Sequence, residues 1–150
     1  MPQPVFKAYV AYGRDASKVE EYTPGAGANE PFLPGDFVKL SAEKAVLCGA
    51  DPAAVHGISE VDSEEAKLLT ANGKVPVLVL DDETVLCMCS DTVPVEATHL
   101  GKEYGIANAG NGIWKVDVAE VTTKVVQVVR LNIPEGRWYV KVIDTVVSND

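Results

Sequence analysis

The segment KVVQVVRLNIPEGRWYVKVI, residues 124–143, predicts a β-hairpin and indicates a mainly β protein. Valine is frequent on both sides of its turn, and β-branched side chains fit the pleated surface of a strand. The turn falls at IPEG, residues 133–136, where Pro and Gly interrupt the two apolar runs. A second hairpin is predicted over YGIANAGNGIWKVDV, residues 104–118, because Asn and Gly in its NAGNG turn readily adopt positive φ.

The apolar runs upstream are short and closely spaced. DFVKL at residues 36–40 is expected to form a strand that turns at SAEK, residues 41–44, and returns as a second strand over AVLCGA at 45–50. HGISEV at 56–61 is expected to form another short strand. KVPVLVL at 74–80 and TVLCMCS at 84–90 are predicted to pair as a hairpin through an acidic turn. Both are apolar on both faces, which is typical of strands in the middle of a structure. Short strands with close turns favour a barrel or a sandwich over alternating strands and helices.

One segment breaks this pattern and predicts a helix. DSEEAKLLTANG, residues 62–73, has Asp62 or Ser63 to cap the first turn and Gly73 just past its end. The expected fold class is therefore mainly β. It is a single small β-barrel or β-tulip-like domain with one short helix and an extended N-terminal arm.

The N-terminal part of the chain is expected to be organised differently from the rest. Residues 5–12, VFKAYVAY, are apolar and follow Pro2 and Pro4, so they predict an extended arm. Residues 13–36 are rich in Pro and Gly and predict a long loop, and long loops in small domains are usually functional. The predicted division is an arm and loop over residues 1–36 and a β-barrel domain over residues 37–150.

Composition limits the classes of partner. The chain has 150 residues, is 47% hydrophobic and has a formal net charge of −9. This acidic balance argues against a nucleic-acid partner, which is bound mainly through Lys and Arg, and against an anionic membrane surface. No run of apolar residues is long enough to span a membrane. The first residues do not resemble a secretory signal peptide, so we expect synthesis in the cytoplasm.

Cys87 and Cys89 form a Cys-x-Cys pair within a predicted strand. Because the side-chain period of a strand is two, both thiols project to one face. A zinc site needs about four ligands, and Cys48, His56 and His99 lie at spacings without a metal signature. Buried cysteine commonly behaves as a small hydrophobic residue. We therefore expect packing roles for the structural core residues Cys48, Cys87, Cys89 and Trp138.

No constellation typical of catalysis is present in the sequence. The two histidines, His56 and His99, have no neighbouring nucleophile motif, and the glycine-rich segment at residues 25–29 lacks the Lys-Ser/Thr ending of a phosphate loop. The acid pairs lie in a predicted turn and at a predicted helix start. We expect a protein that is not an enzyme and has no cofactor and no metal.

The candidate binding residues are aromatic and apolar side chains in the arm and the loop. Such residues often anchor partners. The predicted partner-binding set is Val5, Phe6, Tyr9, Tyr12, Tyr22, Phe32 and Leu33. An alternative stays open at this point: the arm can be the first strand of its own barrel, because strand addition within a subunit and between subunits have the same sequence pattern.

The order of these segments resembles that of the small β-barrel cement proteins, or head decoration proteins, of tailed bacteriophages. The matching residues are PGDFVKLSAEKAVLCGA at 34–50 and HGISEV at 56–61, then THLGKEYGIANAGNGIWKVDV at 98–118 and VVQVVRLNIPEGRWYVKVI at 125–143. In that family a Gly-Asp turn leads into a barrel strand and a Gly-Ile step follows. A Gly-rich hairpin and a valine-rich hairpin then close the barrel.

The resemblance implies a structural role in the virion. Such proteins bind the outside of the phage head and cement neighbouring major capsid subunits. The expected partners are the major capsid protein and other copies of this chain, in a homotrimer, because three-fold sites are numerous on such shells. The expected location is the capsid exterior.

Two other interpretations remain open. The chain can be an intracellular β-barrel that binds a small ligand or metal in its lumen, with Cys87, Cys89 and His99 as lumen residues. It can also be another phage virion component, such as a tail-tube or head-fibre base protein.

Overall fold

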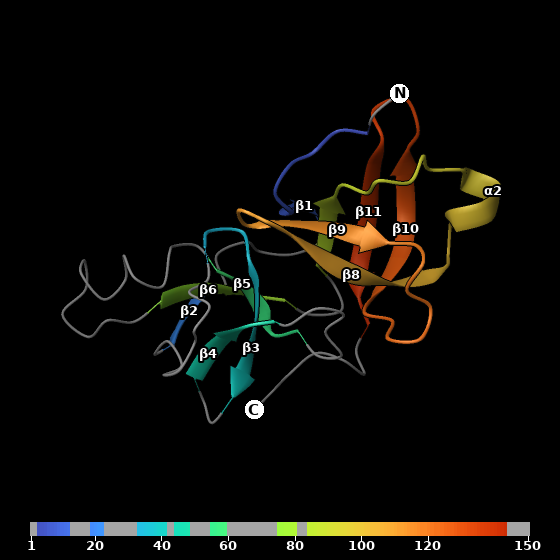
Figure 1. Ribbon diagram of the computed structural model, residues 1–150. Helices are drawn as coiled ribbons and strands as arrows, with labels where there is room; N and C mark the ends of the chain where they lie inside the picture. The colour runs from blue at the N-terminus through green and yellow to red at the C-terminus, as the bar shows by residue number, and fades with distance from the viewer. Residues whose placement is uncertain are drawn as a thin grey trace.

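The computed structural model describes residues 3–12, 19–22, 33–41, 44–48, 55–59, 75–80 and 84–143. Within these ranges the chain forms eleven strands and one short helix. The strands are arranged in two antiparallel sheets, one of six strands and one of five, which Figure 1 shows side by side. The fold is therefore mainly β, as the sequence predicts.

The six-stranded sheet curls into a half-barrel. Its strand order is β1-β7-β11-β10-β8-β9. The curl brings the last strand back toward β7, where Cys89 and Lys115 form an isolated parallel bridge. The Val116 N–H donates to the Cys89 carbonyl oxygen at 2.9 Å. The strands are β1 (Tyr9–Tyr12), β7 (Val85–Met88), β8 (Glu103–Gly110), β9 (Ile113–Asp117), β10 (Val126–Asn132) and β11 (Arg137–Val142).

The five-stranded sheet has the order β2-β6-β5-β3-β4, and all of its neighbouring strands are antiparallel. Its central strand β5 has only three residues, all buried. The strands are β2 (Val19–Tyr22), β3 (Phe37–Ser41), β4 (Lys44–Leu47), β5 (Gly57–Ser59) and β6 (Val75–Val79).

Three predicted hairpins are confirmed, and one is wrong. The pairs β3–β4, β8–β9 and β10–β11 form where the sequence predicts them. The predicted hairpin over residues 74–90 does not form, because β6 pairs with β2 and β5 while β7 pairs with β1 and β11. Both strands are apolar on both faces and can therefore be buried in either sheet. The chain crosses from one sheet to the other between them.

The predicted helix over residues 62–73 lies outside the described residues. The helix that the structure shows is α2 (Glu96–His99), which the sequence did not predict. It is a single turn, and the Nδ1 atom of His99 accepts a hydrogen bond from the Val95 N–H at 2.9 Å. This local bond satisfies a backbone donor at the helix start that an isolated turn leaves unpaired.

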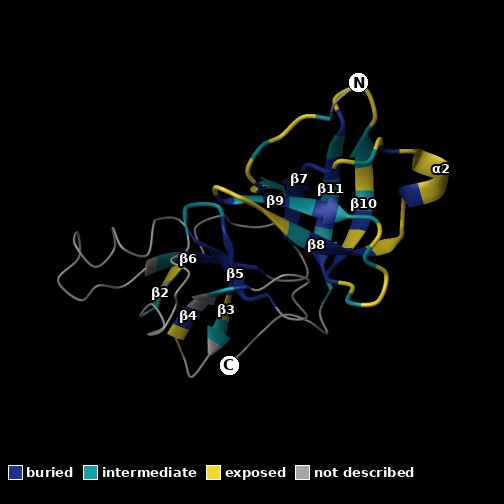
Figure 2. Cartoon of the chain, viewed as in Figure 1, coloured by how far each residue is buried: buried dark blue, intermediate teal, exposed yellow. Residues whose placement is uncertain are grey.

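The main hydrophobic core lies between the two sheets and inside the half-barrel. On β11 the side chains of Trp138, Val140 and Val142 are buried in this core, and the residues between them are half-buried. Phe37, Ile58 and Leu80 enter the same core from the five-stranded sheet and its flanks. Figure 2 shows that buried residues are concentrated along the strands facing this junction. Burial of this apolar surface is the main driving force for the two sheets to associate.

Residues 1–36, assigned from the sequence to an arm and loop, supply one edge strand to each sheet. Strand β1 pairs with β7, and β2 pairs with β6. Ala8, just before β1, is buried. The structure therefore shows strand addition by the arm within its own chain.

Candidate functional site

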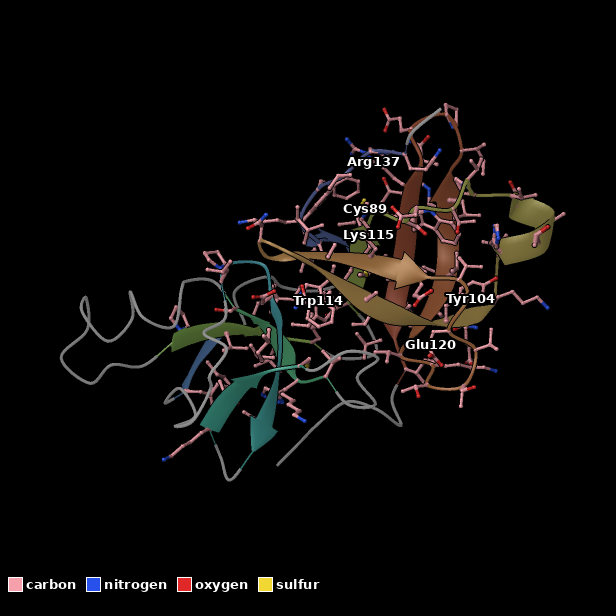
Figure 3. The ribbon with its side chains drawn as sticks, in the orientation of Figure 1. Cys89, Tyr104, Trp114, Lys115, Glu120 and Arg137 are labelled. Carbon is pink, nitrogen blue, oxygen red and sulfur yellow. The ribbon has the colours of Figure 1, made fainter. Side chains whose placement is uncertain are left out.

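The buried side chain of Asp36 connects the turn before β3 to the β8–β9 hairpin. Asp36 accepts a hydrogen bond at 2.7 Å from the indole Nε1 of Trp114 in β9. Its second oxygen accepts the Leu33 N–H at 2.8 Å, which closes the turn. The rings of Phe37 and Trp114 pack with centroids 5.3 Å apart. Figure 3 shows Trp114 at the place where the two sheets meet.

Two glycines let the same turn and hairpin approach each other closely. Gly35 and Gly112 both have positive φ, +95° and +77°. A Cβ atom on Gly112 would lie 2.2 Å from the Pro34 carbonyl oxygen, and one on Gly35 would lie 2.7 Å from the Gly112 carbonyl oxygen. Neither position accepts a side chain without movement of the backbone. The PGD and NAGNG segments, recognised separately in the sequence, form one interlocked unit.

A hydrogen-bonded group in the five-stranded sheet was not predicted from the sequence. The hydroxyl of Tyr22 in β2 donates to the Glu20 carboxylate and lies 2.8 Å from the Nε2 atom of His56, just before β5. Burial and the bond to Glu20 raise the pKa of Tyr22 to about 12. The group joins β2 to the sheet's centre.

The arm residues Phe6 and Tyr9 lie against the six-stranded sheet. Arg137 in β11 donates from Nη1 to the Tyr9 hydroxyl at 3.0 Å, and its guanidinium lies 5.7 Å from the centroid of the Phe6 ring. Tyr9 is 41% exposed and Val5 is 59% exposed. Val5 and Tyr9 therefore offer exposed apolar and aromatic surface, and the backbone of Tyr9 is paired within the sheet.

The other predicted binding residues are distributed over the two sheets. Tyr12 is the last residue of β1 and pairs with Val85. Tyr22 belongs to the hydrogen-bonded group described above, and Leu33 is half-buried in the turn that Asp36 closes. Phe32 lies outside the described residues. The structure places the rings of Phe6 and Tyr9 beside each other, with centroids 6.0 Å apart, and places Tyr22 in the five-stranded sheet.

The three cysteines are buried and form no disulfide with one another. Trp138 is buried in the core. Burial raises the pKa of Cys48 to about 12. Burial also raises the pKa of Cys87, against the opposing effects of hydrogen bonding to Tyr9 and of the nearby Arg137. The Cys89 thiol donates to the Phe6 carbonyl oxygen at 3.3 Å. Thiols with raised pKa values are poor nucleophiles at neutral pH.

His99 and Cys87 lie on opposite faces of the six-stranded sheet. Its ring packs 4.9 Å from the Trp138 ring, on the core face of β11. Cys87 lies beside Tyr9 and Tyr139 on the opposite face of the sheet, because both are its register partners. Burial lowers the pKa of His99. The structure does not bring Cys87 and His99 together in one cavity.

The described part of the chain contains no group of three or more His, Cys, Asp or Glu side chains placed to hold a metal ion. Within the same residues, no helix has the length and apolar character needed to cross a bilayer.

Comparison of the sequence with models of known protein families and with curated proteins found no match to either.

Proposed function

We propose that the protein is a structural virion component that binds the outside of a phage head and cements neighbouring major capsid subunits. One observation carries this proposal: the segments through which the sequence resembles cement proteins are in contact. The turn at Gly35 and Asp36 packs on the hairpin that contains Gly112 and Trp114. Asp36 and Trp114 are 78 residues apart in the sequence. The resemblance rests on turns and strands, so contact between the Gly35–Asp36 turn and the hairpin at Gly112 supports the proposal more strongly than two isolated turns would.

The proposed binding mode is adhesion by many modest contacts. A lattice of capsid subunits fixes the positions of its binding sites, so a symmetric oligomer that engages several of them gains avidity. We propose a homotrimer, made in the host cytoplasm and located on the capsid exterior. The net charge of −9 is compatible with an outer surface and disfavours contact with packaged DNA.

The proposed anchors are Val5, Phe6 and Tyr9. Tyr9 lies in a paired strand, and Arg137 contacts both Tyr9 and Phe6, so these two side chains lose little entropy when a partner covers them. The chain offers a matched control, because Val5 and Val121 are 59% and 57% exposed. Val121 belongs to the loop between β9 and β10 and has no part in the proposed contact.

The test mixes the protein with empty heads of the phage that encodes it and measures occupancy by electron microscopy. The wild-type protein and Val121→Ser are expected to decorate the heads, and Val5→Ser is expected to show reduced occupancy. Absence of wild-type density on the heads would overturn the proposed role. Equal occupancy of the two variants would overturn only the assignment of Val5. Deletion of residues 1–36 is a poorer test, since it removes β1, β2 and the Asp36 carboxylate.

A further inference from the structure

One face of the six-stranded sheet combines stacked arginines with tyrosines. Side chains on β11 alternate, and Trp138, Val140 and Val142 point into the core, so the residues between them lie on the other face. Tyr9 of β1 and Tyr139 of β11 flank Cys87 of β7 in register, and Arg130 of β10 is paired with Tyr139. We call this surface the arginine–tyrosine face, defined by Phe6, Tyr9, Arg130, Arg137, Tyr139 and Lys141.

Both arginines of the face are held against aromatic rings. The Arg130 guanidinium lies 5.1 Å from the centroid of Tyr139, and the Arg137 guanidinium lies 5.7 Å from that of Phe6. Stacking restrains the long side chain but leaves N–H donors at the edge of the guanidinium plane. That edge matches the two oxygens of a carboxylate. Figure 3 shows Arg137 well separated from Trp114 and the junction of the sheets.

The charge of the face is opposite to that of the chain. It carries three cations, Arg130, Arg137 and Lys141, whereas the whole chain has a net charge of −9. Two carboxylates lie nearby. Glu135 is 3.4 Å from the Arg137 Nε and 56% exposed, and Glu103 of β8 is exposed and pairs in register with Gln127, which also pairs with Lys141. Within the described residues Arg130 has no carboxylate partner.

The backbone beneath these side chains is held by strand pairing on both sides of β7. Cys87 has no exposed area although it lies on this face, because Tyr9 and Tyr139 lie beside it on neighbouring strands. A preorganised set of tyrosine and arginine side chains is typical of the energetic centre of a protein interface.

We propose that the arginine–tyrosine face docks a carboxylate-rich segment of a partner protein. The tyrosine and phenylalanine rings supply apolar contact area, and Arg130 and Arg137 bind carboxylates through paired N–H donors. The face shares Phe6 and Tyr9 with the proposed capsid anchors, so this proposal rests on that surface and names the chemistry of the partner segment that it binds. Peptide binding tests it without a phage head, and its failure is therefore distinguishable from failure of the cementing role. A short carboxylate-rich segment is favoured over single-stranded nucleic acid for two reasons. The paired guanidinium donors match a carboxylate, and a long phosphate backbone would extend beyond the face onto the rest of the chain, whose net charge is strongly negative.

The experiment measures binding to the full-length protein by amide NMR at low salt. The probes are a Glu-rich peptide, the same peptide with every Glu replaced by Gln, and oligothymidylate. The wild-type protein is expected to bind the Glu peptide with shifts confined to β1, β7, β10 and β11. Arg130→Ala is expected to weaken binding about tenfold. Arg130→Lys should be intermediate, because lysine keeps the charge but loses the paired donors.

The control is Lys39→Ala, which removes one exposed cation from β3 in the other sheet. It is expected to bind the Glu peptide like the wild-type protein. Equal binding of the Glu and Gln peptides, equal losses in Lys39→Ala and Arg130→Ala, or no binding of any probe would overturn the proposal. Tighter binding of oligothymidylate would assign the face to nucleic acid instead. Self-association that Arg130→Ala abolishes would assign it to a second copy of this chain. Either result also overturns the proposal.

Discussion

The indole N–H of Trp114 donates a 2.7 Å hydrogen bond to the buried carboxylate of Asp36 across 78 residues of sequence. The bond joins the turn before β3 of the five-stranded sheet to the β8–β9 hairpin at one edge of the six-stranded sheet. Asp36 also accepts the Leu33 N–H and so closes its own turn. One side chain therefore fixes both the conformation of the turn and its position against the β8–β9 hairpin.

Replacing Asp36 with Asn tests this bond with little change in volume. The amide has only one acceptor oxygen, so it cannot serve both the Trp114 and Leu33 donors, and one buried N–H is left unpaired. We expect a loss of about 1.5–3 kcal/mol in the free energy of unfolding, the range for hydrogen bonds to charged groups. Urea denaturation followed by tryptophan fluorescence measures it. Asp91→Asn is the control, because that side chain is 83% exposed and its bond to Lys115 contributes under about 1 kcal/mol. Equal losses in the two variants would contradict the role given to Asp36.

Gly112→Ala tests the close contact between turn and hairpin. Alanine there combines a positive φ with a Cβ 2.2 Å from the Pro34 carbonyl oxygen. Gly110→Ala is the matched control in the same hairpin, since it also has a positive φ, +89°, but nothing within 4 Å of the added Cβ. We expect about 1–2 kcal/mol for Gly110→Ala from backbone strain alone. Gly112→Ala should lose more than about 3 kcal/mol. Similar thermal denaturation midpoints for both variants would show that the contact relaxes easily.

Thiol reactivity tests the packing role of the cysteines. Cys48 and Cys87 have raised pKa values and all three thiols are buried, so each should react slowly with a disulfide reagent in the native state. All three should react rapidly after unfolding in denaturant. The absorbance of the released chromophore gives the rates. A fast native phase from Cys87 or Cys89 would instead favour a reactive site near the β7 strand.

The titration of His99 gives a prediction for pH. Burial lowers its folded-state pKa below the unfolded value of about 6.5. As pH falls through 6.5 the unfolded chain binds the proton first, so the folded state loses stability from there down to the folded-state pKa. Above 6.5 this contribution is constant. Proton NMR of the imidazole gives the pKa directly, with His56→Gln used to assign the two histidine signals. An inflection for His99 at or above 6.5 would contradict the expected direction.

The local elements of the fold could be predicted from the sequence. The hairpins β8–β9 and β10–β11 depend on Asn-Gly or Pro-Gly turns and on valine-rich flanks, and both features act between residues close in the chain. The arm was expected to be extended, and it forms β1. The helix α2 was not expected, because a four-residue helix carries no periodic pattern to recognise.

The candidate site was only partly predictable. Aromatic content singled out Phe6 and Tyr9, but nothing in the sequence indicated that Arg137, 128 residues from Tyr9, would hold them. The group of Tyr22, Glu20 and His56 was missed for the same reason. Its members are ordinary residues until strand pairing brings β2 beside the centre of its sheet.

The sequence by itself determined where most of the strands and tight turns form, since propensity and turn chemistry are properties of neighbouring residues. The prediction of a loop over residues 13–36 was wrong at β2, a strand that forms by pairing with the distant β6. Only the tertiary structure decided that β6 and β7, both apolar and adjacent in sequence, belong to different sheets. It also decided that Asp36 meets Trp114. The sheet that a strand joins depends on the total packing energy of many residues that are distant in sequence, and a local sequence pattern does not report that energy.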